Sequence, residues 1–65
     1  MIEAKCYGVW GRSRYYRTKD GETFSIADNK HYFYHGNVIT GKNAGLKLLN
    51  GEEIEELKSK IEFAE

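Results

Sequence analysis

The segment Arg14-Tyr-Tyr-Arg-Thr-Lys-Asp-Gly-Glu-Thr-Phe-Ser-Ile26 decides the fold, because it has the pattern of a β-hairpin. β-Branched and aromatic residues flank the dipeptide Asp20-Gly21, which accepts the positive φ angles of a two-residue turn. In that register one face carries Tyr15, Phe24 and Ile26, with Arg17 at its margin, and is predicted to face the core. The opposite face then carries Arg14, Tyr16, Thr18, Thr23 and Ser25. A slip of one residue would exchange the two faces, since successive side chains of a strand alternate.

The residues around this hairpin predict further strands. Residues 2–7 alternate between apolar and polar side chains, which is the period of a half-buried strand. Residues 30–40 have the pattern of a second hairpin that turns at Gly36-Asn37, so that residues 38–40 form its second strand. Residues 46–49 are predicted as a short final strand or as an extended lead-in to a helix.

The last part of the chain predicts an amphipathic helix. Asn50 can cap it, and Glu53 three residues later completes the pattern of a capping box. The apolar stripe of this helix consists of Ile54, Leu57, Ile61 and Ala64. Phe63 lies off the stripe, which is explained either by fraying of the last turn or by a contact with a partner.

These patterns predict an α+β fold in which residues 1–65 form a single domain. A small antiparallel sheet of four or five strands, with two hairpins, carries a C-terminal amphipathic helix on one face. A chain of this length buries only about 60% of the surface of its unfolded form, so its core is thin. Cys6 is the only cysteine, and no Cys/His cluster suggests a structural metal. Stability must then come from apolar packing, from self-association as a homodimer, or from a partner.

The net charge of the chain is zero, but charge is unevenly distributed. Residues 1–50 contain eight Lys/Arg and four Asp/Glu, a net charge of +4, whereas residues 51–65 contain two and six, a net charge of −4. A basic sheet and an acidic helix are therefore expected. The sequence shows no signal peptide and no apolar run of about 20 residues that could cross a membrane. With a single thiol, this predicts a cytoplasmic protein.

Three groups of residues could carry chemistry, and each has a simpler structural explanation. Residues 36–43 approach the pattern of a phosphate-binding loop, but they lack its final Ser or Thr, and residues 38–40 are predicted as a strand. His31 and His35 would lie roughly 13 Å apart along a strand, too far to share one ion. Cys6 alternates with apolar residues and is predicted to be a small core residue. The sequence therefore predicts no enzyme, no metal site and no cofactor.

The segment Trp10-Gly-Arg-Ser-Arg-Tyr-Tyr-Arg17 departs furthest from what a small core requires. It combines Trp, Arg and Tyr, the residue types that dominate the binding energy of many protein interfaces. Gly8 and Gly11 indicate a bend or bulge next to Trp10. The predicted partner-binding residues are Trp10, Arg12, Arg14, Tyr16, Arg17, Tyr32 and Tyr34. The competing interpretation places Trp10 and Tyr15 in the core, with arginine stems lying across them.

Two functions fit this surface. The first is a small non-enzymatic regulator or inhibitor that binds another protein, of the kind that phages encode. The second is a single-stranded nucleic-acid-binding module, in which arginines contact phosphates and aromatic rings stack on bases. The isoelectric point of about 6.7 favours protein binding, because general nucleic-acid binders are usually strongly basic. No membrane partner is expected.

Overall fold

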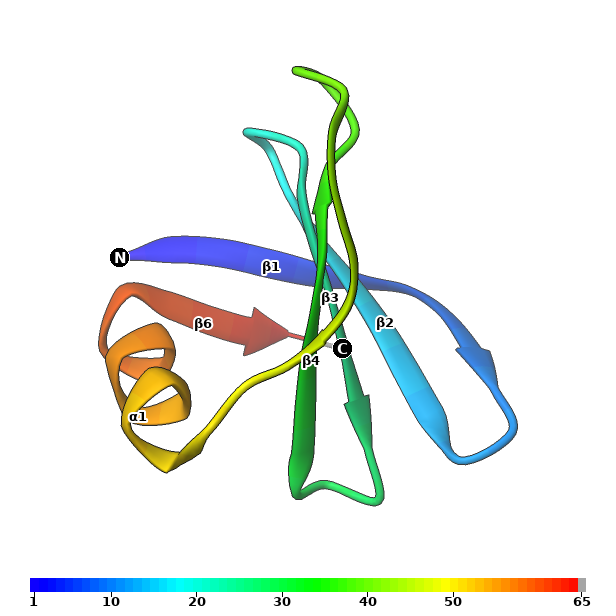
Figure 1. Cartoon of the computed structure of the whole chain (residues 1–65), viewed down its shortest axis with the longest axis vertical. Helices are drawn as coiled ribbons and strands as arrows, with labels where there is room; N and C mark the ends of the chain where they lie inside the picture. The colour runs from blue at the N-terminus through cyan, green and yellow to red at the C-terminus, as the bar shows by residue number, and fades with distance from the viewer. Residues whose placement is uncertain (65) are drawn as a thin grey trace.

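The computed structural model describes residues 1–64 and has one α-helix packed on a six-stranded sheet (Figure 1). The strands are β1 (Ile2–Trp10), β2 (Ser13–Thr18), β3 (Glu22–Ala27), β4 (His31–Asn37), β5 (Lys42–Leu48) and β6 (Ile61–Ala64). The helix α1 spans Gly51–Lys60. These elements confirm the predicted α+β fold, with more strands than the four or five predicted.

Strands β1 to β5 form an antiparallel meander, and β6 extends the sheet beside β1, so the strand order is β5-β4-β3-β2-β1-β6. β6 runs parallel to β1, with Ile2 opposite Ile61. A parallel neighbour needs a crossover connection, and α1 provides it between β5 and β6 (Figure 1). The strands nearest the two ends of the chain therefore lie side by side.

The first hairpin forms where predicted, but its turn has three residues, 19–21, instead of two. Gly21 closes this turn: its φ angle is 90°, and its N–H donates to the carbonyl oxygen of Thr18 at 3.1 Å. A three-residue turn that ends in a residue with positive φ is a common hairpin connection. The extra loop residue moves the register by one position, so that Tyr16 lies opposite Phe24.

This shift exchanges the two faces of β2, whereas Phe24 and Ile26 of β3 lie in the core as predicted. Tyr16 is buried, with 4% of its surface exposed, and belongs to the core. Tyr15 lies opposite Ser25 and points to the other side of the sheet. The predicted position of Tyr15 in the core and the predicted position of Tyr16 on the outer face are both wrong, because turn length sets the register and register sets the face.

The second hairpin turns later than predicted. β4 continues to Asn37, residues 38–41 form the turn, and β5 begins at Lys42. The predicted turn at Gly36-Asn37 and the predicted strand at residues 38–40 are therefore wrong. The β-forming side chains of residues 38–40 are overridden by a local polar contact, which the side chain of Asn37 makes with the backbone that follows it.

The buried side chain of Asn37 joins the two turns at this end of the sheet. It hydrogen-bonds the N–H groups of Ile39 (2.8 Å) and Thr40 (2.9 Å), the carbonyl of Asp20 (2.9 Å) and the carboxylate of Glu22 (2.7 Å). Val38 adds a hydrogen bond from its N–H to the carbonyl of Gly21 at 2.9 Å. The backbone N–H groups that a phosphate would need in residues 38–40 therefore already have partners within the chain.

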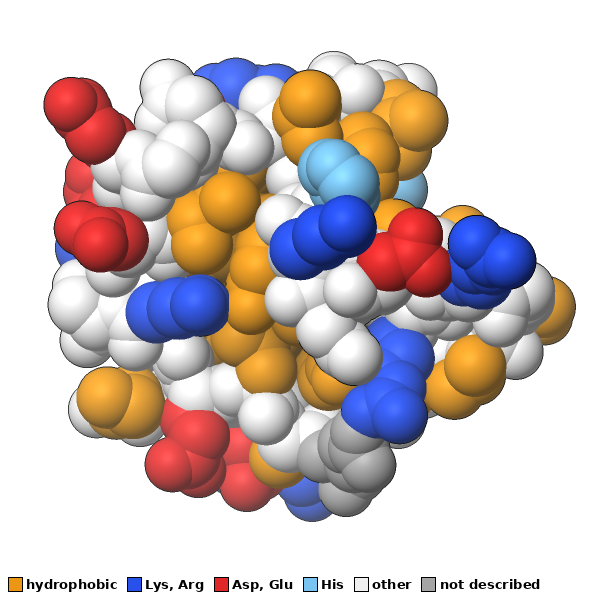
Figure 2. Space-filling model, turned by 90° about the horizontal axis from the view of Figure 1, so that it is seen from below, with side chains coloured by type: hydrophobic (Ala, Val, Ile, Leu, Met, Phe, Trp, Pro, Cys, Tyr) orange, Lys and Arg blue, Asp and Glu red, His pale blue; other side chains and the backbone are white. Residues whose placement is uncertain are grey.

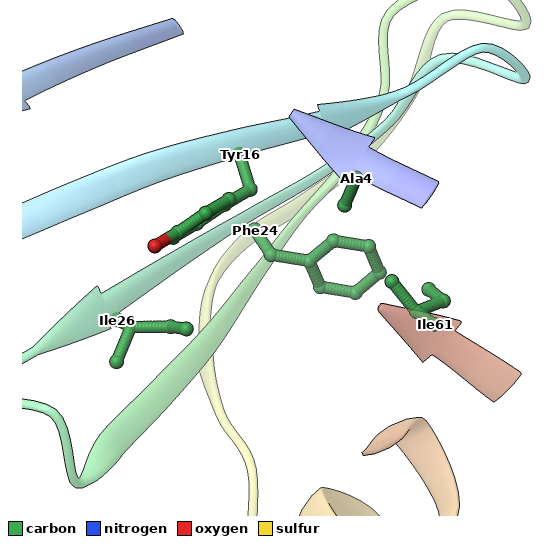
Figure 3. Packing of buried hydrophobic residues seen from close by; sticks show 5 residues of the cluster. All are labelled: Ala4, Tyr16, Phe24, Ile26 and Ile61. Atoms are coloured by element: carbon green, nitrogen blue, oxygen red, sulfur yellow. The ribbon is translucent and has the colours of Figure 1, made fainter. Parts of the chain in front are cut away.

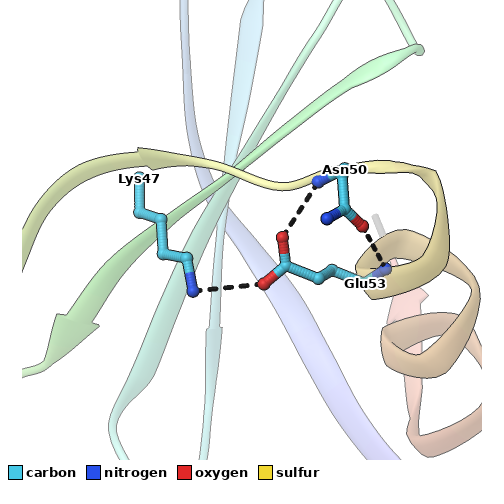
Figure 4. A network of polar contacts seen from close by, with 3 residues as sticks. All are labelled: Lys47, Asn50 and Glu53. Carbon is cyan, nitrogen blue, oxygen red and sulfur yellow. Dashed lines mark hydrogen bonds and ion pairs between the residues drawn. The ribbon is translucent and has the colours of Figure 1, made fainter.

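The helix α1 begins as predicted. The side chain of Asn50 accepts a hydrogen bond from the N–H of Glu53 at 2.9 Å, and the carboxylate of Glu53 accepts one from the N–H of Asn50 at 3.1 Å. Lys47 of β5 lies 3.1 Å from the same carboxylate (Figure 4). The backbone hydrogen bond from Asn50, followed by the contact with Lys47, lowers the pKa of Glu53. Through its ion pair with Lys47, Glu53 of the capping box also links the end of β5 to the first turn of α1.

The helix ends at Lys60, and residues 61–64 form β6 instead of the predicted last helical turn. Ile61 and Phe63 therefore point to the same side at a period of two. The ring of Phe63 makes edge-to-face contacts with Tyr16, Phe24 and Tyr32, at centroid distances of 5.1, 5.9 and 5.9 Å. The predicted helical stripe through Ile61 and Ala64 is wrong, and Phe63 is a core contact, not a frayed residue.

The core lies between the sheet and α1. Its buried apolar residues are Ala4, Tyr16, Phe24, Ile26 and Ile61, whose side chains converge from β1, β2, β3 and β6 (Figure 3). Five half-buried residues surround them: Cys6, Tyr32, Tyr34, Leu57 and Phe63. A core of this size matches the expectation for so short a chain. It uses only one face of the sheet.

Candidate binding surface

One face of the sheet packs against α1, and no helix lies on the other face in the part of the chain that the structure describes. We call the second side the open face. Its central side chains are Lys5, Tyr7, Trp10, Tyr15, Arg17, Phe33 and His35. They come from β1, β2 and β4, which the meander places next to or near one another.

Four rings on the open face form a connected cluster, which we call the aromatic patch: Tyr7, Trp10, Tyr15 and His35. Trp10 and Tyr15 are in edge-to-face contact at a centroid distance of 5.0 Å. Tyr7 lies 6.2 Å from Trp10 and 6.3 Å from Tyr15, and His35 lies 5.8 Å from Tyr15. Trp10 nevertheless leaves 58% of its surface exposed, and Tyr7 leaves 47%.

Gly8 explains how Trp10 can be exposed and still held in place. The pairing of β1 with β2 shifts between Cys6 and Gly8, which confirms the predicted irregularity near Trp10. A Cβ atom on Gly8 would lie 2.0 to 2.8 Å from atoms of the indole ring. The indole therefore lies directly on the backbone of Gly8, which only a residue without a side chain permits.

Arg17 adds a cation to the edge of the aromatic patch. Its Cζ atom lies 5.3 Å from the centre of the Tyr7 ring, a cation–π distance. A groove of about 560 Å³ adjoins this pair. The groove is lined by residues 1–3, Lys5, Tyr7 and residues 17–20. Tyr7 belongs to both the groove and the aromatic patch, so the two form one continuous surface.

His35 is the titratable group of the aromatic patch. Its Nε2 atom lies 2.7 Å from the hydroxyl oxygen of Ser25, within hydrogen-bond distance. Burial lowers the pKa of His35 from its usual value of 6.5, because the imidazolium loses hydration there. The lowered pKa favours the neutral form of His35, so the aromatic patch itself carries little charge.

The structure separates the predicted partner-binding residues into three groups. Trp10 and Arg17 lie on the open face, and Arg12 is exposed in the turn between β1 and β2. Arg14 lies opposite Ile26, which places it on the side of the sheet that faces α1. The remaining three, Tyr16, Tyr32 and Tyr34, also lie on that side.

Besides Lys5, the open face gathers four ring side chains that were not predicted as binding residues: Tyr7, Tyr15, Phe33 and His35. A signal for Tyr7 was present, because the alternation that places Ala4 and Cys6 inside places Tyr7 outside. The other three depend on the registers of β2, β3 and β4, which turn length decides.

No group of three or more His, Cys, Asp or Glu side chains is arranged to hold a metal ion among residues 1–64. Within the same residues, α1 is too short and too polar to cross a membrane. Comparison with models of protein families, with curated proteins and with solved structures finds no match to this chain. The open face is therefore the feature of the described chain that bears on its function.

Proposed function

We propose that this chain is a small non-enzymatic regulator or inhibitor that binds a partner protein through the open face. The observation that carries the proposal is the exposure of the aromatic patch beside Arg17, on a sheet face that no helix of the described chain covers. Trp, Tyr and Arg are the residues that most often dominate binding energies at protein interfaces. A clustered apolar surface of this kind marks an interaction site more often than scattered exposed residues do.

Aliphatic side chains extend the aromatic patch toward β5. Leu48 lies opposite Phe33, so both side chains point to the open face. Leu46 lies two residues earlier, on the same side, and both leucines are exposed. An apolar centre with charged side chains at its margin is the usual composition of a protein interface. This composition supports a protein partner over a phosphate backbone.

A pull-down from the source cell with matched variants tests the proposal. The Tyr7→Ala/Trp10→Ala variant removes the exposed part of the aromatic patch, whereas Glu55→Ala changes an exposed residue of α1. We expect the wild type and Glu55→Ala to retain the same partner. The double variant should bind it at least about 30-fold more weakly, the effect of losing one interface hot spot. Retention of the partner by the double variant would contradict the proposal.

Two measurements complete this test. Thermal unfolding of each variant establishes that it remains folded, which is expected because neither Tyr7 nor Trp10 belongs to the buried core. Sedimentation of the wild type over a range of concentrations tests whether the partner is a second copy of the chain. A homodimer that the double variant abolishes would identify the open face as its interface.

Single-stranded nucleic acid is the second candidate, and one observation favours it. The acidic helix α1 packs on the far side of the sheet, so its carboxylates do not face a strand laid across the aromatic patch. Titration of Trp10 fluorescence with mixed-sequence oligonucleotides, at low and moderate salt, tests this candidate. Binding that weakens steeply with salt would support it, and absent or salt-independent binding would exclude it.

A further inference from the structure

We infer that the partner of the open face is an acidic protein segment, which seats a carboxylate on Arg17 and an apolar side chain on the aromatic patch. This inference rests on the proposed function and specifies the chemistry of the partner. Three features of the charge distribution support it. Arg17 has no anionic partner in the described chain, the groove beside Arg17 has a basic lining, and the acidic helix lies on the other side of the sheet.

Arg17 has no anionic partner within the described chain. It is exposed, and none of the carboxylates of residues 1–64 lies within ion-pair distance of its guanidinium. The ring of Tyr7 supports the guanidinium from one side at 5.3 Å. A guanidinium held on a ring keeps its planar set of donors free for a bidentate contact with a carboxylate. The partner is therefore expected to supply the missing anion.

The groove next to Arg17 is positively charged overall. Its lining contains three cationic side chains, Lys5, Arg17 and Lys19, and two acidic ones, Glu3 and Asp20. Glu3 lies 4.0 Å from Lys5, so these two charges offset each other. Lys19, like Arg17, has no ion pair with any residue of the described chain. An acidic side chain of the partner that enters the groove can contact Arg17. Because Tyr7 belongs to both the groove and the aromatic patch, the adjacent residues of the partner can then contact the aromatic patch.

The rest of the molecule reinforces this preference at long range. The four acidic residues of α1 are Glu52, Glu53, Glu55 and Glu56, and the helix lies across the sheet from the open face. Figure 2 shows several acidic side chains gathered at the left, the side on which α1 lies in Figure 1, and basic side chains spread over the rest of the view. An acidic surface is therefore attracted to the open face and repelled by α1, which orients its approach.

Selection from a random dodecapeptide library, displayed on phage, tests the inference. The library is selected on the immobilised wild-type protein and depleted on the Tyr7→Ala/Trp10→Ala variant, which leaves peptides that need the aromatic patch. A pool of random single-stranded 12-nucleotide DNA is selected in parallel. The affinities of the enriched ligands are then measured through Trp10, the only tryptophan of the chain, for the wild type, Arg17→Gln and Lys60→Gln. Lys60→Gln removes an exposed cation from α1 and serves as the matched control.

The expected result is enrichment of Asp or Glu beside an apolar residue. Arg17→Gln should weaken these peptides about tenfold, as for the loss of a charge-assisted hydrogen-bonded pair, whereas Lys60→Gln should leave them unchanged. Replacing the peptide carboxylate by its amide should weaken binding to the wild type but not to Arg17→Gln. Peptides that need Tyr7 and Trp10 but carry no acid would overturn this inference and leave the proposed function standing. If no peptide that needs Tyr7 and Trp10 emerges, or if only DNA is enriched, this inference and the proposed function are both overturned.

Discussion

Replacing Phe63 by alanine is expected to destabilise the domain by about 3–4 kcal/mol. A Phe→Ala change costs about 3–5 kcal/mol in a fully buried site, and roughly half of that where the ring is half-buried, as here. The three edge-to-face contacts of the ring each add at least about 0.5 kcal/mol. A domain of 65 residues has a free energy of unfolding of roughly 3–10 kcal/mol, so this one side chain supplies a large share of it. The melting temperature should fall by at least about 8 °C.

Urea unfolding, followed by circular dichroism and by Trp10 fluorescence, measures this change. Glu62→Ala is the control, since Glu62 is exposed on the same strand and should change stability by less than about 0.5 kcal/mol. A loss below about 1 kcal/mol for Phe63→Ala would refute the assigned role of Phe63 in the core. A gain of helical signal without a loss of stability would indicate that residues 61–64 are helical, because alanine favours helix over phenylalanine.

Three further predictions concern the ends and the open face of the sheet. Asn37→Ala should cost about 2–3 kcal/mol, because it removes the buried amide that joins the two turns, and hydrogen exchange should show lost protection of the N–H groups of Ile39 and Thr40. Protection equal to that of the wild type would contradict the assigned role of Asn37. Gly8→Ala should displace the indole of Trp10, because a Cβ atom at this position would overlap the ring. The fluorescence emission of Trp10 should therefore change while the fold is retained. Unchanged emission would argue against this geometry. Stability should also fall as the pH drops below about 6.5, the pKa of histidine in the unfolded chain, because burial lowers the pKa of His35 in the fold and the unfolded chain then binds more protons. A His35→Asn variant, compared between pH 7.5 and pH 5, should lose this part of the pH dependence, and an equal slope in both proteins would count against it.

The fold class could be predicted because local signals agree with it. The capping pair Asn50 and Glu53 marks the start of α1, and alternation marks β1. The end of α1 could not be predicted in the same way. Ile61 fits a helical stripe and a strand equally well, and the choice depends on β1, which lies at the other end of the sequence. Phe63 was the informative exception, since it fits only the strand.

The candidate site was predicted in part. Trp10 is exposed on the open face, as expected for a binding residue. Arg17 lies there beside Tyr7 because it shares the register of Tyr15, which the length of the turn decides. Tyr15 and Tyr16 were exchanged because one extra turn residue reverses a strand. Propensity alone cannot choose between a two-residue and a three-residue turn around Asp20-Gly21, since both accept a glycine with positive φ. The contact of Val38 with Gly21 helps to fix that choice, and it is a tertiary contact.

The parallel pairing of β6 with β1 also determines how the domain can fold. Ile2 and Ile61 are neighbours in the sheet although almost the whole chain separates them. Contacts of this kind are slow to form, because closing the long loop costs entropy before the contact stabilises anything. Until β6 arrives, the β1–β5 meander has neither Ile61 nor Phe63 to cover Tyr16 and Phe24. Before β6 joins the sheet, both faces of the β1–β5 meander are therefore accessible to solvent, and the domain is expected to become stable only when residues 61–64 pair with β1.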